Sequence, residues 1–205
     1  LSNVSDFDPA RLGEELERVP PNSMEGHVLS EAARLQRRVL SAYDEYEFRR
    51  AHLLLYDFCN ETLSAFYCDA AKDRLYCDRA GSPRRRRAQA VMWRTAELLC
   101  RLLAPVLAHT ADEAYRALWR DATGEDDADR CVHLTVHEKL SFEADDGWSK
   151  VLAAREQAQK ALEAAKTEGI DNPLDAALIV PDPKGVLKRF AADLADVFGV
   201  SRVML

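Results

Sequence analysis

The stretch from Tyr46 to Cys77 constrains the fold most, because it lacks glycine and proline and keeps a helical period throughout. At about 100° per residue, its apolar side chains share one broad arc and its polar side chains share the other. The apolar arc contains Leu55, Phe58, Cys59, Thr62, Leu63, Phe66 and Ala70, flanked by Tyr56 and Tyr67. An arc this wide is typical of a helix that packs against more than one neighbour. The sequence therefore predicts a central helix over residues 48–77, inside a mainly α-helical protein.

The same periodicity predicts helices on both sides of this stretch. One covers residues 25–46, and another begins at Ser82-Pro83, where serine suits the N-cap and proline the first helical position, and ends or kinks at Pro105. Thr110 and Glu113 have the spacing of a capping box, which predicts a further helix over residues 111–120. With only 8 Gly and 8 Pro in 205 residues, these helices predict an antiparallel bundle with short connections.

The pattern changes after an acidic linker at residues 121–130. Short alternating or apolar runs predict strands, and amphipathic runs predict helices between them. The strands are expected at residues 132–136, 174–180 and 200–205, and the helices at residues 148–166 and 186–198. The predicted organisation is a connector at residues 1–23, a helical bundle at residues 24–130, and a small unit at residues 131–205 that ends in an α-β-α-β order.

Composition and motifs exclude several classes of protein. No apolar run approaches the roughly 20 residues of a membrane span, so we expect no membrane partner. Cys59, Cys68 and Cys77 recur every nine residues, but nine residues turn a helix through about 900° and put successive thiols on opposite faces. We expect reduced cysteines and no metal site. Phosphate loops, serine-hydrolase elbows and zinc-protease motifs are missing from the sequence, so we expect no catalytic residues.

Charge is unevenly distributed along the chain. The formal net charge is −7, which taken alone argues against a nucleic-acid partner. Residues 72–101, however, hold nine basic and three acidic residues, a net charge of +6. Local density of this kind is what binds a phosphate backbone. The alternative is that these arginines pair with acidic side chains of neighbouring helices, or face solvent or an acidic protein partner.

Several motifs resemble class I isoleucyl-tRNA synthetases, in the helical anticodon-binding domain that follows the catalytic core. The matching motifs are Tyr46-Glu47-Phe48, Tyr56-Asp-Phe-Cys-Asn60, Lys72-Asp-Arg-Leu-Tyr76, Ser82-Pro83 and Thr110-Ala-Asp-Glu113, together with the opening residues 1–8. The resemblance covers nearly the whole chain and favours the isoleucyl enzymes over the related valyl and leucyl ones, which stay open as alternatives. Arg49 and Arg84 depart from residues frequent in the family, and both departures add positive charge.

The resemblance implies a cytoplasmic, monomeric ligase that uses ATP and magnesium to charge tRNA(Ile). Its H-x-G-H and K-M-S-K-S motifs are not in this sequence, so we expect a piece of a longer polypeptide that binds the anticodon arm and adjoins a catalytic domain, with no cofactor of its own. Arg and Lys would bind phosphates, and exposed polar or aromatic side chains would read bases. The candidate phosphate contacts are Lys72, Arg74, Arg79, Arg84, Arg85 and Arg86, and the candidate base contacts are Arg49, Tyr56, Asn60 and Ser64. For residues 72–74, an ion-pair network within the protein is the alternative.

Overall fold

A computed structural model describes residues 2–123, 129–167, 169 and 172–205. The middle of the predicted linker at residues 121–130 therefore lies outside the described residues. In chain order, the elements longer than one turn are α1 (Leu12–Glu17), α2 (Met24–Asp44), α3 (Phe48–Asp57), a π-helix (Phe58–Tyr67), α5 (Lys72–Tyr76), α6 (Pro83–Leu103), α7 (Ala108–Thr123), α8 (Trp148–Lys166) and α9 (Ala191–Phe198). The shorter ones are α4 (Cys68–Ala70), strands β1 (Ala177–Ile179) and β2 (Arg202–Met204), and 3-10 helices at Ser2–Val4, Pro9–Arg11, Val132–Leu134, Pro173–Asp175 and Leu187–Phe190.

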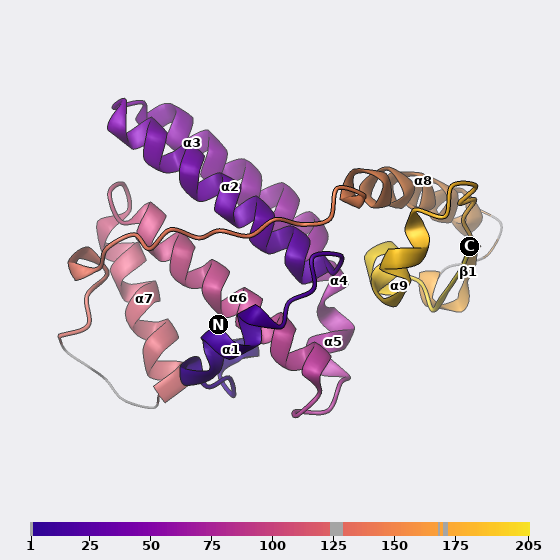
Figure 1. Cartoon of the computed structure of the whole chain (residues 1–205), viewed down its shortest axis with the longest axis horizontal. Coiled ribbons are helices and arrows are strands. Elements are labelled where there is room, and N and C mark those ends of the chain that lie inside the picture. Colours follow the sequence, from indigo (N-terminus) through magenta and orange to yellow (C-terminus); the bar gives the residue numbers. More distant parts are fainter. Residues whose placement is uncertain (1, 124–128, 168, 170–171) are drawn as a thin grey trace.

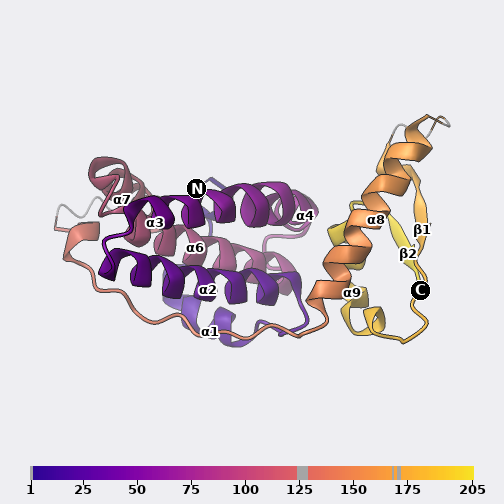
Figure 2. The same ribbon diagram turned by 90° about the horizontal axis from the view of Figure 1, so that it is seen from above.

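Helices α2, α3, α6 and α7 form the bundle, and α8, α9 and the strands form a smaller α/β unit beside it (Figure 1). An extended segment runs along the bundle from the α7 side to α8, as Figure 2 shows. Gln36 holds this segment to α2, because its amide donates to Glu138 O and accepts from Leu140 N, both at 2.8 Å. The predicted bundle followed by a small α-β-α-β unit is confirmed.

One core region fills the bundle, and another joins the bundle to the α/β unit. Side chains of α2, α3 and α6, among them Val39, Leu55 and Leu102, fill the centre of the bundle. A second core joins the base of the bundle to the α/β unit, where Val28 and Phe66 share a cluster with Trp148. Burial of this shared apolar surface holds the two parts together.

The N-terminal residues, predicted as a connector, pack on the bundle. Val4 and Phe7 are buried with Trp93 of α6 and Leu118 of α7. Ser23 then caps α2 by accepting from Gly26 N at 3.1 Å. Gly26 approaches the preceding turn so closely that a Cβ there would lie 2.5 Å from Pro20 O.

The central helix differs from its prediction. Instead of one α-helix over residues 48–77, the chain forms α3, the π-helix and α4, and a turn at Ala71 precedes α5. A π-helical turn holds more residues than an α-helical one, yet the predicted apolar arc still faces the core, since Phe58, Phe66 and Ala70 are buried. Of the two tyrosines predicted to flank this arc, Tyr67 is buried and donates its hydroxyl to Ala88 O at 3.2 Å, whereas Tyr56 of α3 is exposed.

Two further predictions are wrong. Residues 132–136 contain a 3-10 helix instead of a strand, because Asp112 accepts from Val132 N and the Thr135 hydroxyl donates to Val132 O at 2.6 Å. Helix α7 begins at Ala108, so Thr110 lies inside it and is not its cap. Ala111 N donates to Leu107 O at 2.8 Å, so the helical hydrogen bonds of α7 begin before the predicted capping box.

The α/β unit contains a parallel pair of strands joined through α9. Ala177 pairs with Arg202, Leu178 with Val203, and Ile179 with Met204. A crossover helix is what a parallel connection needs. Helix α9 ends at Gly199, which has φ 69° and therefore takes the left-handed conformation that glycine adopts most readily.

Candidate nucleic-acid interface

The arginine run at the start of α6 is engaged with carboxylates of the same chain. Arg85 binds Asp6 with both terminal nitrogens, at 2.7 and 3.1 Å, and Arg86 donates to Asp6 O at 2.6 Å. The guanidinium of Arg85 also holds the pKa of Asp6 below its usual range. Arg84 pairs with Asp78 at 3.1 Å. The run therefore holds the N-terminal residues and the preceding loop to the bundle.

Arg74 is fully buried at the junction between the bundle and the α/β unit. Its guanidinium binds Glu25 of α2 at 2.7 Å, Asp193 of α9 at 2.6 Å and Asp196 of α9 at 2.7 Å. Burial alone lowers the pKa of Arg74, but the three carboxylates outweigh burial and raise it. A side chain that solvent cannot reach cannot contact a phosphate here, so we remove Arg74 from the candidate contacts. Arg74 instead forms an ion-pair network within the protein, which is the alternative that the sequence leaves open for residues 72–74.

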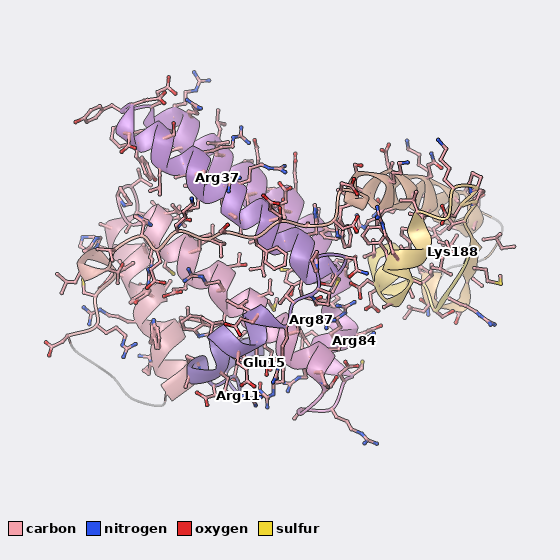
Figure 3. All side chains as sticks on the ribbon, in the orientation of Figure 1. Arg11, Glu15, Arg37, Arg84, Arg87 and Lys188 are labelled. Carbon is pink, nitrogen blue, oxygen red and sulfur yellow. The ribbon has the colours of Figure 1, made fainter. Side chains whose placement is uncertain are left out.

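Two arginines of α6 extend the ion-pair network around Arg74. Arg87 lies 3.4 Å from Glu25, and Arg84 lies 3.4 Å from Asp196. Figure 3 places both residues at the end of α6 that is nearer the α/β unit. The backbone joins as well, because Met24 N donates to Asp193 at 2.7 Å. The basic stretch that the sequence singles out thus consists largely of arginines that hold elements of the fold together.

The remaining predicted phosphate contacts are exposed. Lys72 lies at the surface of α5 and pairs with Asp69 at 2.8 Å. Arg79, in the loop before α6, is exposed. Neither side chain is fixed by a buried partner, so both can reach a phosphate.

The four predicted base contacts lie together along α3 and the π-helix. Arg49 and Tyr56 are seven residues apart and share one face of α3, and Asn60 and Ser64 continue along the π-helix. All four side chains are exposed, and the Tyr56 ring lies 6.2 Å from the His52 ring. The structure therefore separates the predicted site into this α3 stripe and the corner between α5 and α6.

Sequence reasoning missed a group of basic and aromatic residues beside the α3 stripe. Arg38 of α2 lines an open hollow of about 700 Å³ with Arg49, Tyr46 and Phe48. Arg37 is exposed next to Arg38, and Figure 3 shows it on α2, farther from the α/β unit than Arg84. The sequence does contain a signal for the two arginines, since neither Arg37 nor Arg38 has an acidic residue three or four positions away.

Ion pairing separates this hollow from the rest of the basic surface. Among the described residues, Arg37, Arg38 and Arg49 make no ion pair within 4.0 Å. Their charges are therefore available to an anionic partner, unlike those of Arg84, Arg85 and Arg86. We name the surface formed by Arg38, Tyr46, Phe48, Arg49 and Tyr56 the α2–α3 surface, and Arg37 is exposed next to Arg38 on α2.

The described residues give little support for metal or membrane binding. No three His, Cys, Asp or Glu side chains among them lie close enough together to hold a metal ion. The five cysteines are free thiols, and burial raises the pKa of Cys59, Cys68 and Cys100. No helix in the described part of the chain is long and apolar enough to cross a bilayer.

Comparison with known families identifies the class. Residues 25–177 match the family model described as the anticodon-binding domain of tRNA ligase, and the chain belongs to this family. It is 37% identical over 214 residues to the isoleucine–tRNA ligase of Moorella thermoacetica, and 37% identical to that of Brevibacillus brevis. The enzyme of Geobacter sulfurreducens is 35% identical. These alignments cover 99–100% of this chain and 22% of each relative, so the chain spans about a fifth of their length. The resemblance to isoleucyl enzymes is confirmed.

Proposed function

We propose that this chain binds the anticodon arm of tRNA(Ile) and positions the tRNA for aminoacylation by a catalytic domain of the same polypeptide. The α2–α3 surface is the observation that carries the proposal. In a chain with a net charge of −7, it combines exposed aromatic rings with arginines that have no ion-pair partner among the residues that the structure describes. Guanidinium groups bind phosphates, and aromatic rings stack with the unpaired bases of an RNA loop.

Each group of residues has a role in this proposal. Arg37, Arg38 and Arg49 bind the phosphate backbone, with Lys72 and Arg79 as more distant contacts. Tyr56, Asn60 and Ser64 face the bases of the loop. Arg84, Arg85 and Arg86 act indirectly, because their pairs with Asp6, Asp78 and Asp196 hold the fold that carries the surface.

We assign catalysis to a part of the polypeptide that corresponds to the regions of the relatives outside the aligned 22%. The ATP and magnesium that tRNA charging requires would bind in that part. We place the reaction in the cytoplasm and the protein in a monomeric state. Light scattering of the purified chain tests the monomeric state.

The binding test uses the 205-residue chain and a fluorescently labelled stem-loop with the isoleucine anticodon. We expect binding that weakens as salt rises, because each phosphate contact releases counterions. A scrambled loop on the same stem should bind more weakly. Stem-loops with valine and leucine anticodons test the two related specificities. Equal binding of all loops would contradict anticodon recognition, and absence of binding would favour a helical protein-interaction module.

A further inference from the structure

Tyr46 has an unfavourable backbone conformation at the turn between α2 and α3. Its φ is 58°, in the left-handed region, and among the described residues it is the one non-glycine residue with a positive φ. A bulky L-residue reaches this region at a cost in free energy, whereas glycine adopts it freely. A strained residue of this kind persists where the surrounding structure fixes it, often at a functional site.

The fold does not need the side chain of Tyr46. Tyr46 is 82% exposed as a residue, so its side chain gains little from burial. The turn is closed by backbone bonds, from Tyr46 N to Tyr43 O at 3.0 Å and from Glu47 N to Ala42 O at 2.7 Å. Glycine at position 46 could make the same bonds with less strain. An explanation for the tyrosine must therefore come from what its ring binds.

The neighbours of Tyr46 form a half-open aromatic site. The ring of Phe48, itself half exposed, lies 6.5 Å from the Tyr46 ring at an interplanar angle of 69°, and the Tyr43 ring lies 5.9 Å from Phe48 on the other side. The rings of Tyr46 and Phe48 border the hollow of about 700 Å³, a volume within the range of small-ligand sites. Leu53 adds an apolar wall.

The charges around the hollow favour an anionic occupant. Arg38 and Arg49 line it without an ion-pair partner among the described residues, while Arg50 is paired with Glu47 at 2.8 Å. The carboxylate of Asp57 also lines the hollow and can accept hydrogen bonds from base amino groups. Exposed rings beside free guanidinium groups suit a nucleotide, whose base stacks while its phosphate is neutralised.

We propose that the turn between α2 and α3 is a nucleobase-stacking site, in which the rings of Tyr46 and Phe48 take one unpaired base of single-stranded RNA. Arg38 and Arg49 bind the phosphates that flank this base. The site rests on the proposed function, since it requires that the chain binds RNA. Beyond the proposed function, the site specifies where on the protein an unstacked RNA base binds and names Tyr46 as a residue that it stacks on.

The test compares Tyr46→Gly and Tyr46→Phe in the 205-residue chain. The RNA is the isoleucine anticodon stem-loop with 2-aminopurine at single loop positions, whose fluorescence is quenched on stacking. Tyr46→Phe keeps the ring and should bind with unchanged affinity and quenching. Tyr46→Gly should weaken binding about tenfold and abolish quenching at one position. Its urea midpoint should stay equal or rise, because glycine relieves the strained φ.

Tyr76→Gly is the control for loss of an exposed tyrosine, because Tyr76 is 69% exposed on α5, away from the hollow. It should leave quenching unchanged. If the wild-type chain binds the stem-loop and Tyr46→Gly binds it equally well with full quenching, the stacking site is overturned and the proposed function stands. If the wild-type chain does not bind the stem-loop, both are overturned. The same change in Tyr46→Phe and Tyr46→Gly would also overturn the site, since it would show that the ring is not what binds.

Discussion

Arg74 and Asp193 form an ion pair of 2.6 Å although 119 residues separate them in the chain. Arg74 belongs to the bundle and Asp193 to α9, so this pair joins the bundle to the α/β unit. Glu25 and Asp196 complete the coordination of the guanidinium. The junction is thus defined by a buried cationic centre as well as by apolar packing.

Arg74→Met should destabilise the protein by about 3 to 5 kcal/mol, because it leaves buried carboxylates without a counter-charge. Urea unfolding measures this change. Arg79→Ala, at an exposed position five residues later, is the control and should change stability by less than about 0.5 kcal/mol. If Arg74→Met does not fold, Arg74→Lys, which keeps the charge but loses the planar fork, should show faster hydrogen exchange in α9. Wild-type stability in the Met variant would contradict the role of Arg74.

The triple variant Arg37→Ala, Arg38→Ala, Arg49→Ala should reduce the slope of log affinity for RNA against log salt by about 2, because up to three phosphate contacts are lost. A matched control removes three cations that are paired at the surface, in the variant Arg18→Ala, Lys160→Ala, Lys166→Ala. The control should keep the slope. Equal slopes for the two triple variants would remove the α2–α3 surface from the interface.

Asp6→Asn and Arg85→Ala should each loosen the N-terminal residues, because the two side chains bind each other through both carboxylate oxygens. In a double-mutant cycle, we expect a coupling of about 1 kcal/mol, since Asp6 is partly exposed. Urea unfolding gives the coupling, and hydrogen exchange of Val4 and Phe7 locates it. Additive effects on the free energy of unfolding would show that the Asp6–Arg85 pair does not stabilise the protein. If Arg85→Ala lost much of its RNA affinity without losing stability, Arg85 would have to be a phosphate contact.

Stability should fall as pH decreases from about 6.5 to about 4, because His27 is neutral in the folded protein. Burial, aided by the charge of Arg34, lowers the pKa of His27 from 6.5 to about 4. The unfolded chain therefore binds a proton in this range that the folded chain does not bind. At pH 5 the loss relative to pH 7 should be about 2 kcal/mol.

The control for this pH dependence is His27→Phe, which keeps an aromatic ring beside Trp148 and Phe66 but does not titrate. Urea midpoints measured at several pH values should be flatter for this variant between pH 6.5 and 4. The lowered pKa values of Asp6 and Asp112 affect stability only at lower pH, below about 4. A wild-type curve that is flat between pH 6.5 and 4 would contradict a neutral His27 in the folded protein.

The sequence by itself determined the order of helices and strands, and it indicated the family. Periodic apolar residues and the Ser82-Pro83 start are local signals, so they predicted α2, α6, α8 and the α-β-α-β unit. The same reasoning failed where a local rule was interrupted. A π-helix replaces the α-helix expected after Phe58, although its buried and exposed faces are the predicted ones. Residues 132–134 form a short helix instead of a strand, with Val132 N donating to Asp112.

Only the tertiary structure decided what each charge does. Arg74 and Arg85 belong to one basic stretch of sequence with Arg79, but one is buried among carboxylates, one binds Asp6, and one is exposed. Their partners lie up to 122 residues away, beyond any helical spacing that a sequence pattern reveals. Long-range packing therefore pairs most arginines of the densest basic stretch with carboxylates of the same chain. Within the part of the chain that the structure describes, it leaves Arg38 and Arg49 without such partners beside Tyr46, at the turn where α2 meets α3.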